Sequence, residues 1–340
     1  MHKHGGDIYS NTNVIDFSAN INPLGMPTFI KKEAKDAVDV CSSYPDALQR
    51  DLINAIAERE KVKTESIICT NGAAELIFGI CFALKPKKAL VLSPSFEEYR
   101  QALEAIDCHV KEYRLSKKNG FLLDDKFLSQ LSHDLDMVFI CNPNNPTGQL
   151  VDDYLLNRII DSCSSKNIFL VIDECFLDFL NNENKLSKKN KGAFVIKAFT
   201  KMYCMAGIRL GYGIYDDFDV INRIKKVLQP WNVSTVAQKA GVLAAKDKDF
   251  QRLSRQLIET EKEFVLGELS GIVKKIYGKD ANYIFFEDEG ELYEKLLAKG
   301  IMIRDCCNFN GLTKGFFRIA IKTREENLKL IKAIKEVKNG

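Results

Sequence analysis

Short β-rich segments alternate with helical patterns through the middle of the chain, between about residues 66 and 215. Apolar and β-branched residues fill these segments, and each is short enough for a strand. The segments are 67–70 (IICT), 89–93 (ALVLS), 137–141 (MVFIC), 168–173 (IFLVID), 194–199 (FVIKAF) and 210–215 (LGYGIY). Regular alternation of strands and helices predicts a mostly parallel α/β sheet.

The pattern changes after Trp231, where long helical stretches replace the alternation. We expect helices over 234–246, 249–270 and about 289–299, strands at 283–286 (YIFF) and 316–321 (FFRIAI), and a charged terminal helix. The first 45 residues are dense in Asn, Gly and Pro and predict an arm or strap. We therefore predict an arm over 1–45 that contributes to the smaller unit, a large domain over 46–230 and a smaller α+β domain over 231–340. The most polar window, 181–191, predicts a solvated loop.

Composition narrows the class of protein. Of the 340 residues, 46% are hydrophobic and 28% are charged, which indicates a soluble globular protein with more than one domain. Lys and Arg number 49 and Asp and Glu number 46, so the net charge is +3. A balance so close to neutral favours neither nucleic acid nor a membrane surface as a partner.

Cysteines and the N-terminus indicate the compartment. Ten cysteines are scattered through apolar segments without a C-x-x-C pair or zinc-ligand spacing, so we expect reduced thiols and no metal site. The first residues hold no apolar stretch for a signal peptide, and no run of about 18 apolar residues occurs anywhere. We expect a cytoplasmic protein.

The segment 141–149 (CNPNNPTGQ) follows an apolar strand and precedes a helix that we expect to begin near Asp152. Two prolines and a glycine end the strand abruptly. In an open parallel sheet, ligands bind beyond the carboxyl ends of the strands, so Asn144, Asn145 and Thr147 are candidate site residues. Taken alone, the segment fits an ordinary strand-to-helix turn equally well.

Two charged residues stand at the ends of the next two predicted strands along the chain. The interval from each strand end to the next fits one strand–helix–strand unit. Asp173 closes the strand 168–173, and Lys201 follows the strand 194–199. A carboxylate at the end of so apolar a strand needs a partner, because burying it alone is costly. Lys201 stands among Phe199, Met202 and Tyr203, so we expect a desolvated amine with a lowered pKa rather than a surface lysine.

A fourth segment, from Thr70 onward (TNGAAELIFGICFAL), joins a strand to an apolar helix through small residues. Small residues at a helix start let backbone N–H groups approach an anion. The four segments together place an amine, a carboxylate, an amide and a phosphate-sized anion site on one sheet edge. Pyridoxal phosphate requires such a set.

On these motifs the chain resembles the fold-type I pyridoxal-phosphate enzymes of the class I and II aminotransferase family, over essentially its whole length. The resemblance implies a large, mostly parallel seven-stranded sheet domain, a smaller α+β domain and pyridoxal 5'-phosphate as cofactor. It implies Lys201 at the cofactor aldehyde, Asp173 at the ring nitrogen and Asn145 at the ring hydroxyl. The further cofactor contacts that it implies are Gly72, Ala73, Ala74, Phe96, Thr200, Arg209 and Tyr44, the last reaching a neighbouring subunit of a homodimer.

The same resemblance implies substrate contacts. Arg318 in FFRIAI would take an amino-acid carboxylate, and Arg304 in GIMIRDCCNF would take a substrate phosphate. His4 and Asn20 are further substrate candidates, although an N-terminal histidine is more often simply solvated. Two positions depart from the family pattern. Phe176 replaces a tyrosine that binds the ring hydroxyl, and Ala198 replaces a hydroxyl residue at the phosphate.

Within the family, two branches are the most similar: the histidinol-phosphate aminotransferases and the threonine-phosphate decarboxylases. The segments that favour the decarboxylases are 4–6 (HGG), 16–25 (DFSANINPLG), 173–176 (DECF), 197–212 (KAFTKMYCMAGIRLGY) and 229–238 (QPWNVSTVAQ). We therefore expect decarboxylation of a phosphorylated amino acid such as phosphothreonine or phosphoserine. The alternatives are transamination of histidinol phosphate, aspartate or an aromatic amino acid and, from another class, a non-catalytic binding protein. The last is disfavoured because the chain retains Lys201.

Overall fold

The computed structural model describes residues 4–180 and 192–339. The polar loop predicted at 181–191 lies outside the described residues. None of the described helices is long and apolar enough to cross a membrane. The cytoplasmic location stays a prediction.

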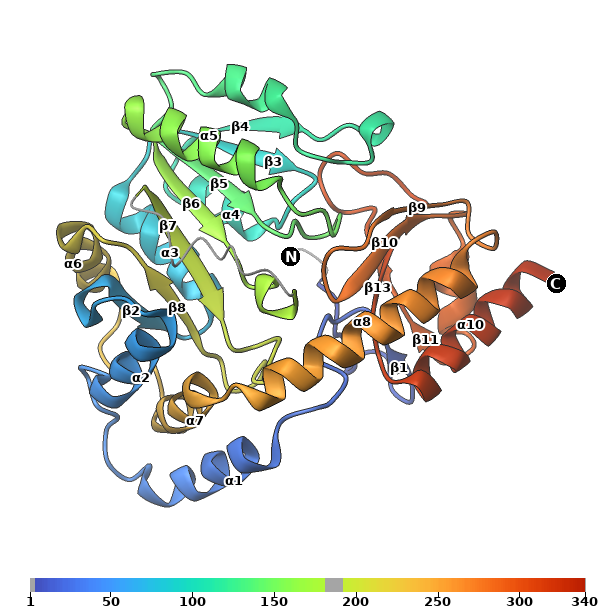
Figure 1. The fold of residues 1–340 in the computed structure, drawn as a ribbon, viewed down its shortest axis with the longest axis horizontal. Coiled ribbons are helices and arrows are strands. Elements are labelled where there is room, and N and C mark those ends of the chain that lie inside the picture. Colours follow the sequence, from blue (N-terminus) through green and yellow to red (C-terminus); the bar gives the residue numbers. More distant parts are fainter. Residues whose placement is uncertain (1–3, 181–191, 340) are drawn as a thin grey trace.

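A seven-stranded sheet forms the larger layer of the molecule (Figure 1). Strand β8 pairs antiparallel with both neighbours, and the other strands run parallel to one another. In sheet order, the strands are β2 (Ile67–Thr70), β8 (Gly211–Ile214), β7 (Ala193–Ala198), β6 (Phe169–Asp173), β5 (Met137–Cys141), β3 (Lys88–Ser93) and β4 (His109–Arg114). The predicted α/β sheet is confirmed. Strand β4 was not predicted, because it is a half-exposed edge strand in which charged residues alternate with apolar ones.

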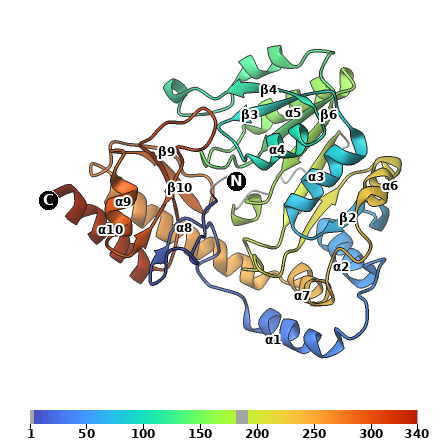
Figure 2. The ribbon, with the colours of Figure 1, turned by 180° about the vertical axis from the view of Figure 1, so that it is seen from behind.

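Helices cover both faces of this sheet because its strands alternate side chains between two cores. Val91, Phe139 and Val171 face one core, which Figure 2 shows from the side of α3 and α4. Val138 and Ile140 face the other core. The first core is covered by α3 (Ala73–Leu84), α4 (Glu98–Glu104) and α6 (Phe218–Val227), and the second by α5 (Asp153–Ser165).

The smaller unit is built on a second sheet, which is antiparallel and has the order β12–β13–β10–β9. Its strands are β12 (Arg304–Asp305), β13 (Phe316–Ala320), β10 (Tyr283–Glu287) and β9 (Lys275–Gly278). The helices of this unit are α8 (Asp249–Leu269), α9 (Leu292–Leu297) and α10 (Arg324–Asn339). Strand β1 (Ile15–Asp16) of the arm pairs with β11 (Ile301–Met302), so the chain start is built into this unit.

Long helix α8 runs from the large sheet to the smaller unit (Figure 1). Before it, α7 (Thr235–Lys246) packs against α2 (Arg50–Glu60) and α1 (Thr28–Asp36). Helix α1 was not predicted, because Ile30 is its one fully buried apolar residue and the helical pattern is correspondingly weak. The domain limits at residues 45 and 230 stay a prediction.

Candidate active site

The strands β5, β6 and β7 run in parallel register and end side by side. Cys141 pairs with Asp173, and Asp173 pairs with Ile196. The loops that follow these strands therefore open on one edge of the sheet, as expected for a parallel sheet. A cavity lies at this edge. Among the predicted site residues, those that line it are His4, Asn20, Ala73, Ala74, Phe96, Asn145, Asp173, Thr200, Lys201, Arg209, Arg304 and Arg318.

Of the residues that the resemblance implies, Gly72 and Tyr44 do not line the cavity. Gly72 adopts φ 82° and supports Arg209: a Cβ built there would lie 2.5 Å from Nη2 of that guanidinium, so a larger side chain would displace it. Tyr44 is 79% exposed and stacks on Trp231 with ring centroids 4.5 Å apart. Tyr44 does not line the cavity of its own chain, and its reach to a second subunit stays a prediction.

An anion cradle is formed where α3 begins. Gly72 occupies the N-cap position and contributes no side-chain hydrogen bond, so the first N–H groups of this 12-residue helix are available to a ligand. Strand β8 passes close by, and a Cβ on Gly211 would lie 2.5 Å from the Ala73 nitrogen. Arg209 adds a positive charge beside the turn. Backbone donors, the helix dipole and a guanidinium together suit a phosphate.

Both carboxylate oxygens of Asp173 accept hydrogen bonds. The Tyr99 hydroxyl donates to Oδ2 over 2.7 Å, and the Cys175 N–H donates to Oδ1 over 2.9 Å. Tyr99 is fully buried and stacks on Phe139 with centroids 5.0 Å apart. The carboxylate is thus held in one orientation at the cavity wall.

Lys201 provides an amine in the same cavity. Burial, and then the nearby Arg318 and Arg209 guanidinium groups, lower its pKa to about 8, in agreement with the expected desolvation. The arm holds this turn of chain. The Asn22 N–H donates to the Lys201 carbonyl over 3.2 Å, and the Asn22 side chain donates to the carbonyl of Met202 over 2.8 Å.

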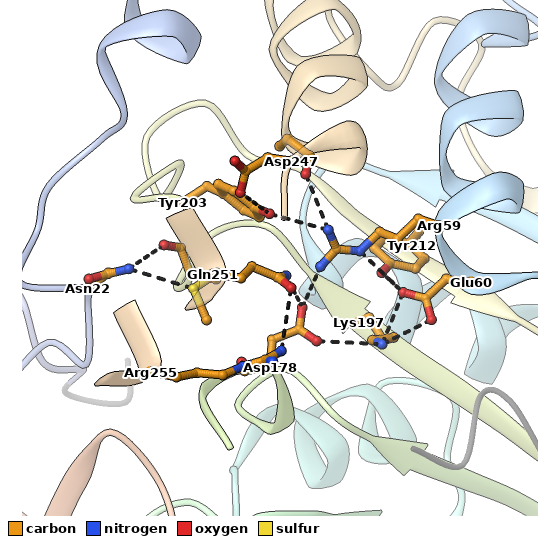
Figure 3. A network of polar contacts seen from close by, with 12 residues as sticks. Asn22, Arg59, Glu60, Asp178, Lys197, Tyr203, Tyr212, Asp247, Gln251 and Arg255 are labelled. Atoms are coloured by element: carbon orange, nitrogen blue, oxygen red, sulfur yellow. Dashed lines mark hydrogen bonds and ion pairs between the residues drawn. The ribbon is translucent and has the colours of Figure 1, made fainter. Parts of the chain in front are cut away.

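A buried ionic network lies behind that turn (Figure 3). Lys197, four residues before Lys201, donates to Glu60 over 3.1 Å and lies 3.8 Å from Asp178. Arg59 donates to Asp178 over 3.0 Å, and Tyr212 donates to Glu60 over 2.7 Å. Burial alone would lower the pKa of Lys197, but Glu60 and Asp178 raise it above its ordinary value. Two buried lysines of one chain segment thus have opposite pKa shifts, because one is paired with carboxylates and the other is near guanidinium groups.

The two candidate substrate arginines are cross-strand partners. Arg304 on β12 lies opposite Arg318 on β13. One Arg318 nitrogen donates to the side-chain oxygen of Asn145, and another donates to the Ser18 carbonyl over 2.7 Å. Arg304 donates to the Asn308 side chain over 2.8 Å. Side chains opposite one another on neighbouring strands project to the same face, so two positive charges meet at the cavity wall.

The loop that carries Asn145 is held by the smaller unit. The Tyr283 hydroxyl donates to the Asn144 carbonyl over 2.9 Å, and the Asp280 N–H donates to the Gly148 carbonyl over 2.9 Å. Asn144 itself does not line the cavity, and it accepts a hydrogen bond from Ser95. The expectation that Asn144 and Thr147 face the site is therefore wrong: both are buried and bonded to each other.

Two residues of the N-terminal segment reach the cavity. The Asn20 side-chain oxygen is buried there without a hydrogen-bond partner among the described residues. His4 contacts Glu98, with Nδ1 3.3 Å from Oε1. The next residue, Gly5, lies against the Ser18 backbone, since a Cβ on it would lie 2.3 Å from the Ser18 carbonyl oxygen.

The general model for class I and II aminotransferases matches residues 12–334. The chain belongs to this family. The resemblance drawn from the motifs is thus confirmed, and with it the fold class and an enzymatic activity of the lyase or aminotransferase type.

Relatives in the family come from both branches. The threonine-phosphate decarboxylase of Salmonella typhimurium is 36% identical, with 99% of this chain and 97% of that protein aligned. The crystal structure of the histidinol-phosphate aminotransferase from Clostridium acetobutylicum superposes with a TM-score of 0.89 at 32% identity, covering 95% of this chain and 98% of that one. The L-threonine-O-3-phosphate decarboxylase from Porphyromonas gingivalis has the same fold, with a TM-score of 0.84 at 22% identity over 95% and 99% of the two chains.

Of the two departures from the family pattern, one lines the cavity. Phe176 lines the cavity and packs edge-on against Tyr283, with centroids 5.2 Å apart. It presents no hydroxyl where the family pattern has one. Ala198 is buried at the end of β7 and presents no hydroxyl either.

Several residues at the site were missed from the sequence. Tyr99 and Glu98 stand in the same segment (SPSFEEY) as Phe96, and the Tyr99 ring lies edge-on to the Phe96 ring with centroids 5.6 Å apart. Asn308 and Phe309 follow Arg304 in sequence, and the Arg304 guanidinium lies 5.1 Å from the Phe309 ring centroid. No pattern along the chain pointed to Ser18.

Proposed function

We propose that this enzyme binds pyridoxal 5'-phosphate and decarboxylates a phosphorylated amino acid of the phosphothreonine type. The family supports the cofactor, since its members use pyridoxal phosphate. The 36% identity to a threonine-phosphate decarboxylase over almost the whole chain supports the reaction.

The residues at the cavity fit the cofactor in charge and in donor type. The α3 turn at Ala73 and Ala74, with Arg209, would hold the phosphate, and Lys201 would bond to the aldehyde. Asp173, held by Tyr99, would keep a proton on the ring nitrogen. When bound, pyridoxal phosphate supplies an electron sink for the carbon that loses its carboxylate.

The observation that carries the substrate class is the pair Arg304 and Arg318. A substrate with one carboxylate and one phosphate presents two anionic groups, and two guanidinium groups on one face of the smaller sheet can bind both. Arg318 would take the carboxylate, and Arg304 with Asn308 would take the phosphate. Both arginines are buried, so these charge-assisted contacts would form in a site that is largely shielded from water.

The chain's own groups would then act on the substrate in sequence. The fraction of Lys201 that is neutral, set by a pKa of about 8, would accept or return a proton at the substrate amine. Arg318 would hold the carboxylate in the direction that decides which bond to the α-carbon breaks. The positive field of the two arginines also favours a doubly anionic substrate during binding.

Transamination is the second candidate, since a histidinol-phosphate aminotransferase shares 32% identity and the fold. Product analysis separates the two. Purified enzyme with pyridoxal phosphate is incubated with O-phospho-L-threonine, with and without an oxo acid. Carbon dioxide and an amine without the oxo acid support decarboxylation. A keto product that requires the oxo acid contradicts it.

We also propose a homodimer. Tyr44 and Trp231 form an exposed aromatic pair, and the family resemblance assigns Tyr44 to the cofactor phosphate of a neighbouring subunit. A large exposed aromatic pair is typical of a protein interface.

A further inference from the structure

Glu98 is a carboxyl group in the active-site cavity, and the cofactor and substrate contacts proposed above give it no role. It is the first residue of α4, two residues after Phe96, and its side chain is 13% exposed. Its Oε1 lies 3.3 Å from Nδ1 of His4. Its Oε2 is buried and has no hydrogen-bond partner among the described residues. One oxygen is therefore anchored, and the other is available to a ligand in the cavity that the residue lines.

The charges around Glu98 come from several elements. Glu97 of the same helix and Asp173 of β6 are negative, while Lys201 and, when protonated, His4 are positive. Burial is the largest effect on the pKa of Glu98 and raises it, and the negative charges of Glu97 and Asp173 act in the same direction. A backbone hydrogen bond at Glu98 and the charge of Lys201 oppose them, and the combined result is a pKa of about 7. Near neutral pH a large fraction of the molecules therefore carries a proton on Glu98.

Several other proton-bearing side chains at or beside the cavity are less suited to acid catalysis. Burial raises the pKa of the Cys141 and Cys175 thiols far above neutrality. The Tyr99 proton is held in its hydrogen bond to Asp173, and burial raises its pKa as well. Lys201 has a role of its own at the cofactor. Among these groups, Glu98 combines a transferable proton with an oxygen that has no protein partner.

Decarboxylation needs a proton at carbon. The bond between the α-carbon and the carboxylate breaks, carbon dioxide leaves, and the electron pair stays with the α-carbon. That carbon must then gain one proton to become the amine product. If the proton is delivered elsewhere, hydrolysis yields an aldehyde and the amino nitrogen stays on the enzyme.

We propose that Glu98 is a catalytic acid that donates its proton to the α-carbon after carbon dioxide has left. This inference rests on the proposed decarboxylation. The O–H bond of Glu98 breaks, a C–H bond forms, and Glu98 remains as a carboxylate. His4, which is 58% exposed on its side chain, links Glu98 to solvent and returns the proton from water. The net reaction consumes one proton for each carbon dioxide released.

The experiment compares products in Glu98→Gln, which keeps the size of the side chain and removes its acid proton. Holoenzyme is incubated with O-phospho-L-threonine, and carbon dioxide, amine and aldehyde are quantified. We expect carbon dioxide to be released still, while the ratio of amine to aldehyde falls by about 100-fold, a typical contribution of general acid catalysis. In Glu98→Asp, which keeps an acid proton, the ratio of amine to aldehyde should lie between those of Glu98→Gln and the wild type. The matched control is Glu104→Gln, the same change at the exposed end of α4, which should leave the ratio unchanged.

An independent readout needs neither cofactor nor turnover. Infrared spectra of the apoenzyme should contain a carbonyl band of a protonated carboxylic acid that disappears as pH rises through about 7. The band should be missing in Glu98→Gln and present in Glu104→Gln. A band that persists in Glu98→Gln would overturn the assignment.

The two proposals fail in different ways. If wild-type enzyme releases no carbon dioxide from phosphothreonine, the decarboxylase proposal is wrong, and the step assigned to Glu98 goes with it. If wild-type enzyme releases carbon dioxide and Glu98→Gln gives an unchanged ratio of amine to aldehyde, the Glu98 proposal alone is wrong.

Discussion

The Tyr99 hydroxyl donates a 2.7 Å hydrogen bond to Asp173, which lies 74 residues further along the chain. The bond joins α4 to the end of β6 at the floor of the cavity. It orients the carboxylate that we assign to the cofactor ring nitrogen, from a helix that begins at Glu98, two residues after Phe96. The α4 segment therefore contributes to the site at three points.

Tyr99 and Asp173 should differ in the size of their effects. Asp173→Asn should fold and lose activity by several orders of magnitude, because an amide cannot stabilise a protonated ring nitrogen. Tyr99→Phe removes one hydrogen bond to a charged group, about 1.5–3 kcal/mol, so cofactor affinity and kcat/KM should fall by about one to two decades. Tyr113→Phe is the matched control, since Tyr113 donates a 2.8 Å bond to Asp124 away from the cavity. Near wild-type turnover in Asp173→Asn would contradict the assignment.

Lys201 should be the point of covalent cofactor attachment. Borohydride reduction followed by peptide mass analysis should find the cofactor on Lys201 in the wild type and no adduct in Lys201→Ala. Because the neutral amine is the nucleophile and the Lys201 pKa is about 8, the rate of attachment to the apoenzyme should rise as pH increases through that value. A reducible adduct on another lysine of Lys201→Ala would refute the assignment.

Arg304 and Arg318 should have separable duties. Arg304→Ala should raise KM for phosphothreonine by about one to two decades, because it removes a charge-assisted pair worth about 1.5–3 kcal/mol. Arg304→Ala should change KM little for an unphosphorylated amino acid, whereas Arg318→Ala should weaken the binding of both substrates. Arg304→Lys should recover only part of the lost affinity for phosphothreonine, since lysine cannot form the two-pronged contact. Steady-state titrations with both substrates test this, and equal losses from Arg304→Ala would exclude the division of roles.

The buried network should matter for stability. Lys197→Met leaves Glu60 buried without its lysine and should lower the free energy of unfolding by about 3–5 kcal/mol, measured by urea denaturation. Burial would raise the Glu60 pKa, but Lys197 and Arg59 lower it from an ordinary 4.5 to about 2. A lowered carboxyl pKa stabilises the fold above about pH 4.5 and ceases to do so as pH falls toward about 2.

The double variant Lys197→Met with Glu60→Gln serves as the control for this prediction. This double variant removes both charges of the Lys197–Glu60 pair and should recover part of the lost free energy of unfolding. The stability difference between wild type and Lys197→Met should also shrink below about pH 4.5, as Glu60 becomes protonated in the variant. If Lys197→Met unfolds at the wild-type urea concentration, the network has no such role.

Tyr44 should act on a second subunit. Sedimentation should find a dimer, and Tyr44→Phe should weaken cofactor affinity by about one decade through the loss of one hydrogen bond to a phosphate, without changing the sedimentation coefficient. When Tyr44→Phe chains are mixed with Lys201→Ala chains, mixed dimers form in which one site has Lys201 from the first chain and Tyr44 from the second. These sites have both residues intact, so cofactor affinity should be restored in a fraction of the sites. A monomer with full activity at assay concentration would contradict the proposal.

The sequence was sufficient for the elements that local chemistry determines. The apolar strands ending at Cys141, Asp173 and Ala198 were readable because a strand buried on both faces is continuously apolar. Their parallel arrangement predicted that Asn145 and Lys201 would come to one edge, and both line the cavity. The half-exposed strand β4 was missed, because charged residues dilute the pattern of an edge strand.

Contacts between distant segments required the tertiary structure. Arg304 lies opposite Arg318 because of the register between β12 and β13, and no spacing along the chain specifies that register. Thr147 appeared to be a site residue in the sequence, but it is buried and bonded to Asn144 under the smaller unit.

The sequence by itself thus determined the family, the strands of the large sheet other than β4, and the residue types at the carboxyl edge of that sheet. Each follows from local periodicity or from chemistry that a few neighbouring residues carry. Only the tertiary structure decided that Tyr99 binds Asp173, that His4 meets Glu98, and that Lys197 is paired with carboxylates while the pKa of Lys201 is lowered. These relationships depend on burial and on distances between charges, which arise when segments far apart in the chain pack together.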